Sequence, residues 1–182
     1  MISLKTQRLQ LIPLDYEMLS IWKNMGRPAL EKFLQLTPNS WDIEKFYAQE
    51  TELALRDFWL PMTKKFPFDF LWYTNWEIIL SEKSCSVGGI GLGGMPSNEG
   101  NTEIGYFVDQ KFRGIGIASE ALSALKSWAF QDSDLILLRA ESPVDNLASQ
   151  KVLEKNQFHP TGQKEIRTPE PMEVICWECP KI

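Results

Sequence analysis

The chain runs Gln110-Lys111-Phe112-Arg113-Gly114-Ile115-Gly116-Ile117-Ala118-Ser119-Glu120-Ala121-Leu122 near its middle. Residues 102–108, just before it, combine β-branched and aromatic side chains and predict a strand. Beyond it, apolar side chains recur at helical spacing and predict a helix with one apolar face: Ile117, Ala118, Ala121, Leu122, Leu125, Trp128 and Ala129. The predicted order is therefore strand, basic glycine turn, helix.

This turn has the chemistry of an anion site. Gly114 and Gly116 allow the backbone to approach a ligand without interference from a Cβ atom. The helix that follows offers unpaired N–H groups and the positive end of its dipole, and Arg113 adds charge beside them. The stretch therefore predicts a phosphate-binding site.

Length and composition indicate an ordinary globular protein. The chain has 182 residues, and we expect residues 1–182 to form a single domain. No apolar run approaches the roughly 20 residues that a membrane-spanning helix needs. The N-terminus lacks the charged and then apolar pattern of a signal peptide. We therefore expect a cytoplasmic protein that does not act on a membrane.

Charge and cysteine content exclude further classes. The net charge of −5 argues against broad nucleic-acid binding and is compatible with a cationic substrate such as an amine, although solubility is its usual reason. Cys85, Cys176 and Cys179 make no disulfide framework, and with His159 they lack the spacing of a zinc site. We expect reduced cysteines and no metal.

The remaining patterns predict one α+β domain. Strands are expected at residues 6–14, 72–80, 85–93, 102–108 and 135–140, near Ile166, and at 172–179. Helices are expected after an Asp15 N-cap, around residues 30–36, from an Asn39 or Ser40 cap to Phe58, after Ile117, and from an Asp145 or Asn146 cap to about Asn156. Residues 61–70 read as irregular.

An aromatic cluster surrounds this irregular segment, with two interpretations open. Its members are Phe66, Phe68, Phe70, Trp72, Tyr73 and Trp76. Such clusters belong to a core more often than to a pocket, but this one is also a candidate wall for an acceptor pocket.

A second glycine-rich run, Gly89-Ile90-Gly91-Leu92-Gly93-Gly94, matches the dinucleotide fingerprint literally. That fingerprint requires a helix directly after the glycines, whereas Met95 and Pro96 begin a turn here. We interpret these glycines as a strand with a bulge or a close backbone approach.

Three segments resemble one known family. Arg113-Gly114-Ile115-Gly116-Ile117-Ala118 satisfies the Gln/Arg-x-x-Gly-x-Gly/Ala pattern with which the GNAT acetyltransferase superfamily binds acetyl-CoA. Residues 6–14 and 146–158 resemble the first strand and the Asn-x-x-Ser helix of its ribosomal-protein N-terminal acetyltransferase branch. The three occur in family order.

The resemblance implies a fold and a cofactor site. The fold would be an α/β/α sandwich whose mixed, mostly antiparallel sheet of about six to seven strands splays to admit acetyl-CoA, with helices on both faces. Backbone N–H groups would bind its pyrophosphate from Arg113, Gly114, Ile115, Gly116, Ile117 and Ala118. Phe107 and Val108 would pair with the pantetheine arm, and Asn146 and Ser149 would touch its far side. Asn146 also reads as a plain N-cap. Ser119 either adds a donor or is an ordinary first-turn serine.

The catalytic assignment is less direct. Glu103 is the carboxylate best placed to accept the amine proton, or else a solvent-facing strand residue. Tyr106 is a weaker general-acid candidate that would otherwise pack. Leu153 stands where many relatives carry a tyrosine that protonates the leaving thiolate. Gln157 replaces the glycine normally found before Phe158, which implies a differently built turn if that glycine serves as a left-handed cap.

The sequence thus predicts an acetyl-CoA-dependent N-acetyltransferase that uses no metal and acts on a primary amine, of a protein N-terminus or of a small molecule. The alternative is a non-catalytic domain that binds acetyl-CoA as a sensor or docks a partner. Whether the protein forms a homodimer stays open.

Overall fold

The computed structural model describes residues 2–166 and 171–182 and places all their strands in one sheet. The strands are β1 (Leu4–Lys5), β2 (Leu9–Pro13), β3 (Asn75–Leu80), β4 (Cys85–Leu92), β5 (Asn101–Val108), β6 (Leu137–Pro143), β7 (His159–Ile166) and β8 (Met172–Pro180). Their order is β1-β2-β3-β4-β5-β6-β8-β7, eight strands within the described residues. Only the β5–β6 pair is parallel, so the predicted mostly antiparallel sheet is confirmed.

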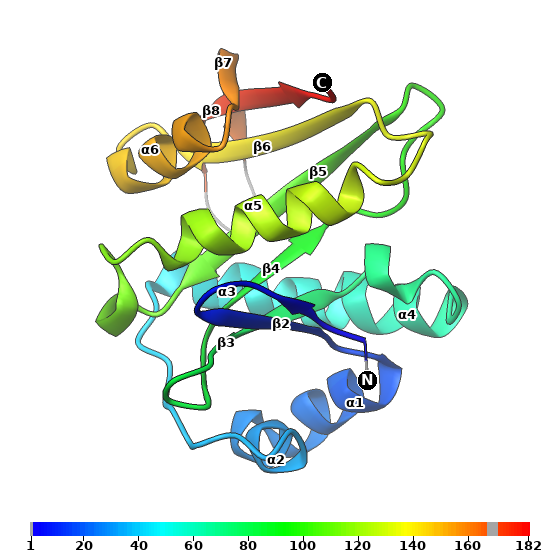
Figure 1. The fold of residues 1–182 in the computed structure, drawn as a ribbon, viewed down its shortest axis with the longest axis vertical. Coiled ribbons are helices and arrows are strands. Elements are labelled where there is room, and N and C mark those ends of the chain that lie inside the picture. Colours follow the sequence, from blue (N-terminus) through cyan, green and yellow to red (C-terminus); the bar gives the residue numbers. More distant parts are fainter. Residues whose placement is uncertain (1, 167–170) are drawn as a thin grey trace.

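Helices cover both faces of this sheet, as expected. They are α1 (Tyr16–Met25), α2 (Arg27–Phe33), α3 (Lys45–Ala54), α4 (Leu60–Lys65), α5 (Ile117–Ala129) and α6 (Leu147–Lys155). The helix α5 crosses one face, with α6 beside it, while α3 and α4 lie behind the sheet (Figure 1). The apolar side of α5 packs in the main core, and a second core joins α1, α2 and the segment between α3 and α4.

The sheet opens at β5. Only its first residues, Asn101 to Glu103, pair with β6, whereas Ile104 to Val108 pair with β4 on the other side. The second half of β5 therefore leaves β6 and creates the predicted splay. The glycine turn and the start of α5 follow directly after this half (Figure 1).

Two local predictions between β2 and β3 need correction. Asp15 caps α1 as expected, accepting from the Met18 N–H at 2.9 Å. Neither Asn39 nor Ser40 caps α3, however, because the helix begins at Lys45 and the Asn39 amide bonds elsewhere. Residues 61–65 are helical because a π-helical turn, Leu55–Trp59, lets the chain continue past Pro61, which has no N–H to donate.

The turn after α6 also differs from expectation. Gln157 itself adopts the left-handed conformation that a glycine would, with φ at 68°. The Phe158 N–H reaches back to the Leu153 carbonyl at 3.1 Å, which completes the turn. The prediction of a differently built turn is therefore wrong, and the conformational cost falls on Gln157.

The second glycine run lies in β4, as interpreted. A Cβ atom on Gly91 would stand 2.7 Å from the Thr74 carbonyl oxygen, and one on Gly89 would overlap the Asn75 side chain. A register shift lies between Ile78 and Ile79 of β3, opposite the start of this run. Both the bulge and the close approach are present.

The aromatic cluster divides between core and surface. Trp72 and Trp76 are buried and pack on Trp128 with ring centroids 5.0 and 5.2 Å apart. Phe66 stacks on Tyr73, while Phe68 is 94% exposed. None of the predicted six lines either cavity described below, so the core interpretation fits Trp72 and Trp76.

Candidate functional site

A cavity of about 360 Å³ lies where β5 leaves β6. It is lined by ten of the eleven residues predicted to bind a cofactor: Phe107, Val108, Arg113, Gly114, Gly116, Ile117, Ala118, Ser119, Asn146 and Ser149. The exception is Ile115, whose side chain is 53% exposed and whose carbonyl accepts from the Arg8 guanidinium at 2.8 Å. We refer to this space as the donor cavity.

The glycine turn leaves backbone N–H groups open toward this cavity. Gly114 and Gly116 have φ of 78° and 86°, which favour glycine. Gly116 is the N-cap of α5, and no side chain caps the helix. The first N–H groups and the positive end of the helix dipole therefore stay available to an anion. A pyrophosphate fits this chemistry.

Basic side chains add to that potential. Arg113 lines the donor cavity with its guanidinium held by the Val108 carbonyl, 3.2 Å from Nε, and the Glu44 carboxylate, 2.5 Å from Nη1. Lys151 and Lys155 line it from α6. These two lysines were not predicted, although their spacing of four residues places them on one helix face and was visible in the sequence.

The first strand region braces the glycine turn. Glu120, in the first turn of α5, accepts from the Thr6 hydroxyl at 2.6 Å and lies 2.7 Å from the Arg8 guanidinium. Arg8 also holds the Ile115 carbonyl. Two of the three segments that carry the family resemblance are therefore in direct contact.

A second cavity of about 350 Å³ adjoins the first. Both are lined by Tyr47, Tyr106, Phe107 and Ser149, so they meet at these side chains. The second cavity is lined by three carboxylates, Glu50, Glu103 and Glu141, and by aromatic side chains that include Phe46, Phe58 and Trp59. We call it the acceptor cavity.

Glu50 of α3 is the carboxylate that the sequence did not identify. Desolvation by its surroundings, and then repulsion from Glu141, raise the pKa of Glu50 to about 7. Its position depends on how α3 crosses the sheet, for which the local sequence contains no signal. Glu103, the predicted base, lines the same cavity, and the side chains of both glutamates are exposed to solvent.

Tyr106 and Phe107 point to opposite faces of β5, as the alternation along a strand requires. The Tyr106 hydroxyl lies 3.0 Å from the Ser149 hydroxyl on α6, whereas the Phe107 ring packs on Trp41, 5.0 Å between centroids. Burial raises the pKa of Tyr106 well above its ordinary value. Tyr106 therefore keeps its proton at the junction of the two cavities.

Among the remaining residues that the sequence singled out, some line the donor cavity and others have a structural role. Asn146 caps α6 by accepting from the Ser149 N–H at 3.0 Å, and its amide donates to the Tyr47 hydroxyl at 2.6 Å. It thus caps the helix and lines the cavity at once. The buried Ser119 hydroxyl accepts from the Asn156 amide at 3.0 Å, which supports the structural interpretation. Leu153 is fully buried in the core, and His159 is exposed at the start of β7.

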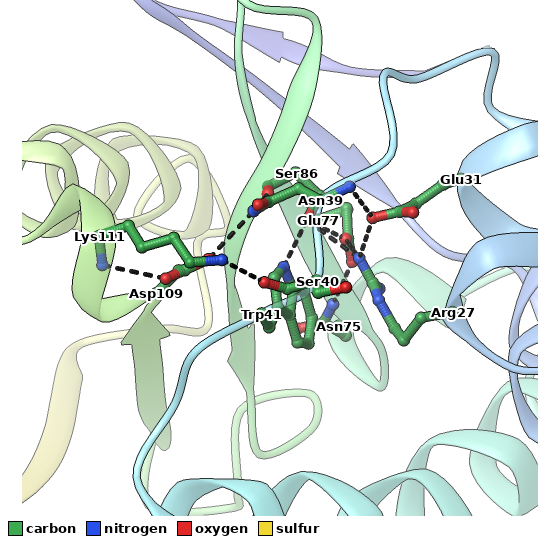
Figure 2. Close-up of polar contacts among 10 residues, drawn as sticks. All are labelled: Arg27, Glu31, Asn39, Ser40, Trp41, Asn75, Glu77, Ser86, Asp109 and Lys111. Carbon is green, nitrogen blue, oxygen red and sulfur yellow. Dashed lines mark hydrogen bonds and ion pairs between the residues drawn. The ribbon is translucent and has the colours of Figure 1, made fainter.

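A buried polar cluster fixes the segment that leads into α3 (Figure 2). Arg27 pairs with the fully buried Glu77 carboxylate and donates to the Ser86 hydroxyl at 3.0 Å. Its guanidinium lies 3.6 Å from the centroid of the Trp41 ring. This ion pair and stacking contact tie α2 and the Trp41 segment to β3 and β4.

The same cluster reaches the glycine turn (Figure 2). The Asn39 amide donates to the Ser86 carbonyl at 2.8 Å and to the buried Asp109 carboxylate at 3.0 Å. Lys111 donates to the Ser40 carbonyl at 2.6 Å. Because Asp109 follows directly after β5, the segment before α3 and the approach to the glycine turn are held together.

Neither a membrane span nor a metal cluster was found in the part of the chain that the structure describes. None of its helices is long and apolar enough to cross a bilayer. Within residues 2–166 and 171–182, no group of three or more histidine, cysteine, aspartate or glutamate residues is arranged to bind a metal ion.

Comparison with known proteins gives consistent results. Residues 8–159 match the family described as acetyltransferase (GNAT) domain. The "Uncharacterized N-acetyltransferase YjdG" of Bacillus subtilis is 29% identical over 87% of this chain and 90% of its own length. The ribosomal-protein-S5-alanine acetyltransferase of Vibrio fischeri superimposes with a TM-score of 0.69 at 16% identity, covering 99% of this chain and 97% of its own. RimL, a ribosomal L7/L12 α-N-protein acetyltransferase solved in complex with coenzyme A, superimposes with a TM-score of 0.68 at 18% identity and 98% coverage of both chains.

Proposed function

The chain belongs to the acetyltransferase (GNAT) family, and we propose that it transfers the acetyl group of acetyl-CoA to a primary amine. One observation supports this most: a cavity shaped for an anionic cofactor meets a cavity lined by carboxylates, and four side chains line both. The cofactor supplies the acetyl group as a thioester. The protein then has to bind it, orient the amine and move two protons.

The donor cavity suits the cofactor in its charge and in its open hydrogen-bond donors. Open N–H groups at the start of α5, with Arg113, Lys151 and Lys155, favour a pyrophosphate. On the half of β5 that has no β6 partner, Val108 directs its backbone groups toward the splay, where its N–H can pair with the pantetheine arm, whereas Phe107 directs its own toward Gly89 of β4. An N–H group there can also stabilise negative charge on the thioester oxygen.

Glu50 is the base that we propose. It lies one helical turn after Tyr47, whose side chain lines both cavities, so its carboxylate is close to the junction. A base titrating near neutral pH is matched to removing a proton from an amine. Glu103, the base expected from the sequence, is three residues before Tyr106, or about 10 Å along the strand.

The transfer then balances as follows. The amine nitrogen forms a bond to the thioester carbonyl carbon, and the carbon–sulfur bond breaks with its electron pair leaving on sulfur. The Glu50 carboxylate takes the proton released by nitrogen. The Tyr106 O–H donates a hydrogen bond to the leaving sulfur and keeps its own proton, and the thiolate takes its proton from solvent; this hydrogen bond compensates for Leu153 at the position where many relatives have a tyrosine.

The test is thiol release from acetyl-CoA with a panel of α-amines, lysine-like amines and small polyamines. We expect release with at least one amine, and loss of most of it when Tyr106 is replaced by Phe. Calorimetric titration with coenzyme A checks binding separately. Tight coenzyme A binding without thiol release for any amine in the panel would favour the sensor or docking domain instead.

A further inference from the structure

The acceptor cavity has a floor made largely of backbone. Gly91 pairs with Gly105, Gly89 pairs with Phe107, and all of these line the cavity together with Gly93. Directly paired residues of an antiparallel sheet share one face, so this face of β4 and β5 is nearly free of side chains. A Cβ atom on Gly105 would meet nothing within 4 Å. The face is open over Gly105, whereas Thr74 and Asn75 lie against Gly91 and Gly89, so an open trough runs along β5 between Glu103 and Phe107.

The trough has two distinct ends. Phe107, at one end, lines the junction with the donor cavity. Glu103, at the other end, is four residues away on the same face of β5, or about 13 Å at the usual rise of a strand. Since Glu50 lies close to the junction, the reacting nitrogen belongs at the Phe107 end.

Glu141 and Glu103 both line the acceptor cavity but differ in their ion-pair partners. Glu141 forms an ion pair with Lys164 of β7. The Glu103 carboxylate has no hydrogen-bond or ion-pair partner among residues 2–166 and 171–182. No arginine, lysine or histidine lines the acceptor cavity in this part of the chain. Lys164, the basic group on which the Glu103 charge acts, is ion-paired with Glu141, and with Glu50 assigned to the reacting proton, Glu103 is the carboxylate left to bind a cation at the far end.

We propose that Glu103 determines specificity by binding a second cationic group of the acceptor, about 10 Å from the amine that is acetylated. The acceptor is then a slender, linear amine with a second ammonium or guanidinium group. Its aliphatic part lies over Gly105 and against the aromatic side chains of α3. A linear diamine and a peptide N-terminus followed by a basic side chain share this chemistry. The inference rests on the proposed function, because it takes Glu50 as the base.

Matched pairs of acceptors test it. The first pair is diaminooctane and octylamine, and the second is a dipeptide amide beginning Ala-Lys and one beginning Ala-Leu. Each is measured by thiol release, and by calorimetric binding to the protein saturated with coenzyme A. We expect the dication of at least one pair to be preferred by about fivefold, as for a partly exposed ion pair. The pair that shows the preference identifies the source of the acceptor.

Two variants locate the effect. In Glu103→Gln the preference is expected to fall to about one, while Glu82→Gln, which removes an equal charge from an exposed turn, leaves it unchanged. In Gly105→Leu, whose side chain would fill the trough, propylamine should still react whereas diaminooctane is excluded. A preference that survives Glu103→Gln, or no preference in either pair, overturns the inference. If Glu103-dependent binding occurs without thiol release from any amine, the proposed function fails and the second-cation site stands.

Discussion

Replacing Glu50 by Gln is the most direct test of the proposed chemistry. The substitution keeps the shape of the side chain but removes the group whose pKa is raised to about 7. In the native protein, protonation of Glu50 should lower kcat/KM by a further factor of about ten per pH unit below that pH, in addition to the loss caused by protonation of the amine itself, because a protonated carboxyl cannot accept the amine proton. In Glu50→Gln, we expect the rate near pH 8 to fall by about a hundredfold to ten-thousandfold, the usual contribution of a general base.

The assay is thiol release at saturating acetyl-CoA, followed as kcat/KM from about pH 5 to pH 9. The amine acceptor titrates as well, near 8 for an α-amine and higher for a lysine-like amine. When the same amine is used for each protein, the part of the pH–rate profile that is caused by the amine stays the same. Only the inflection near 7 should therefore disappear in Glu50→Gln. Glu103→Gln serves as the control and should keep it. An unchanged profile in Glu50→Gln, with the inflection lost in Glu103→Gln, would return the base role to Glu103.

Stability supplies a readout that does not depend on turnover. Because folding raises the pKa of Glu50 from 4.5 to about 7, its contribution to stability is fully present below the lower value and is lost as pH rises through the higher one. Fully buried, such a shift would be worth roughly 3 kcal/mol, but the carboxylate faces an open cavity and solvent screening reduces this to about 1 kcal/mol. Urea unfolding should therefore find Glu50→Gln more stable than the native protein near pH 8 and equal to it near pH 4. Equal stability at both pH values would refute the raised pKa.

Three further outcomes follow from single contacts. Gln157→Gly should raise the free energy of unfolding by about 0.5–1 kcal/mol in urea titration, because glycine adopts the left-handed conformation without steric cost; a loss of stability would contradict this. Arg27→Met should cost about 3 kcal/mol by leaving the Glu77 carboxylate buried and unpaired, and adding Glu77→Gln should restore much of the loss in the same titration. Glu141→Gln should move the inflection of the rate profile to lower pH by removing the repulsion that helps to raise the pKa of Glu50; a shift to higher pH would refute that coupling.

The parts of the fold that sequence reasoning captured are those with local causes. The strand of residues 102–108, the turn at Gly114 and Gly116 and the helix after Ile117 each have a pattern complete within a few residues. The Asn146 cap is equally local, since its side chain accepts from an N–H three residues later. Ten of the eleven residues predicted around the cofactor line one cavity, but Phe107, Val108, Asn146 and Ser149 among them were assigned from the family resemblance and not from a local pattern.

The acceptor side could not be predicted in this way. Glu50 lies on a helix whose start was predicted too early in the chain. Asn39 resembles an N-cap, but its side-chain amide donates to Ser86 and Asp109, which are distant in the sequence. No local pattern distinguishes those two uses of an asparagine. Similarly, the glycines of β4 could be assigned to close backbone approach, but their role as the floor of a cavity depends on Gly105 of the neighbouring strand.

Asp109 links the glycine turn of the donor cavity to the segment that leads into α3. One oxygen of its fully buried carboxylate accepts from the Lys111 N–H at 3.0 Å, which shapes the turn before Gly114, and the other accepts from Asn39 at 3.0 Å. One side chain thus sets the approach to the glycine turn and the position of the segment that leads to Tyr47 and Glu50. Because a carboxylate with both oxygens engaged has little freedom to move, the donor cavity and the wall of the acceptor cavity are held in a fixed relation. Direct transfer between two substrates requires such a relation, since small displacements of the reacting atoms cost large factors in rate.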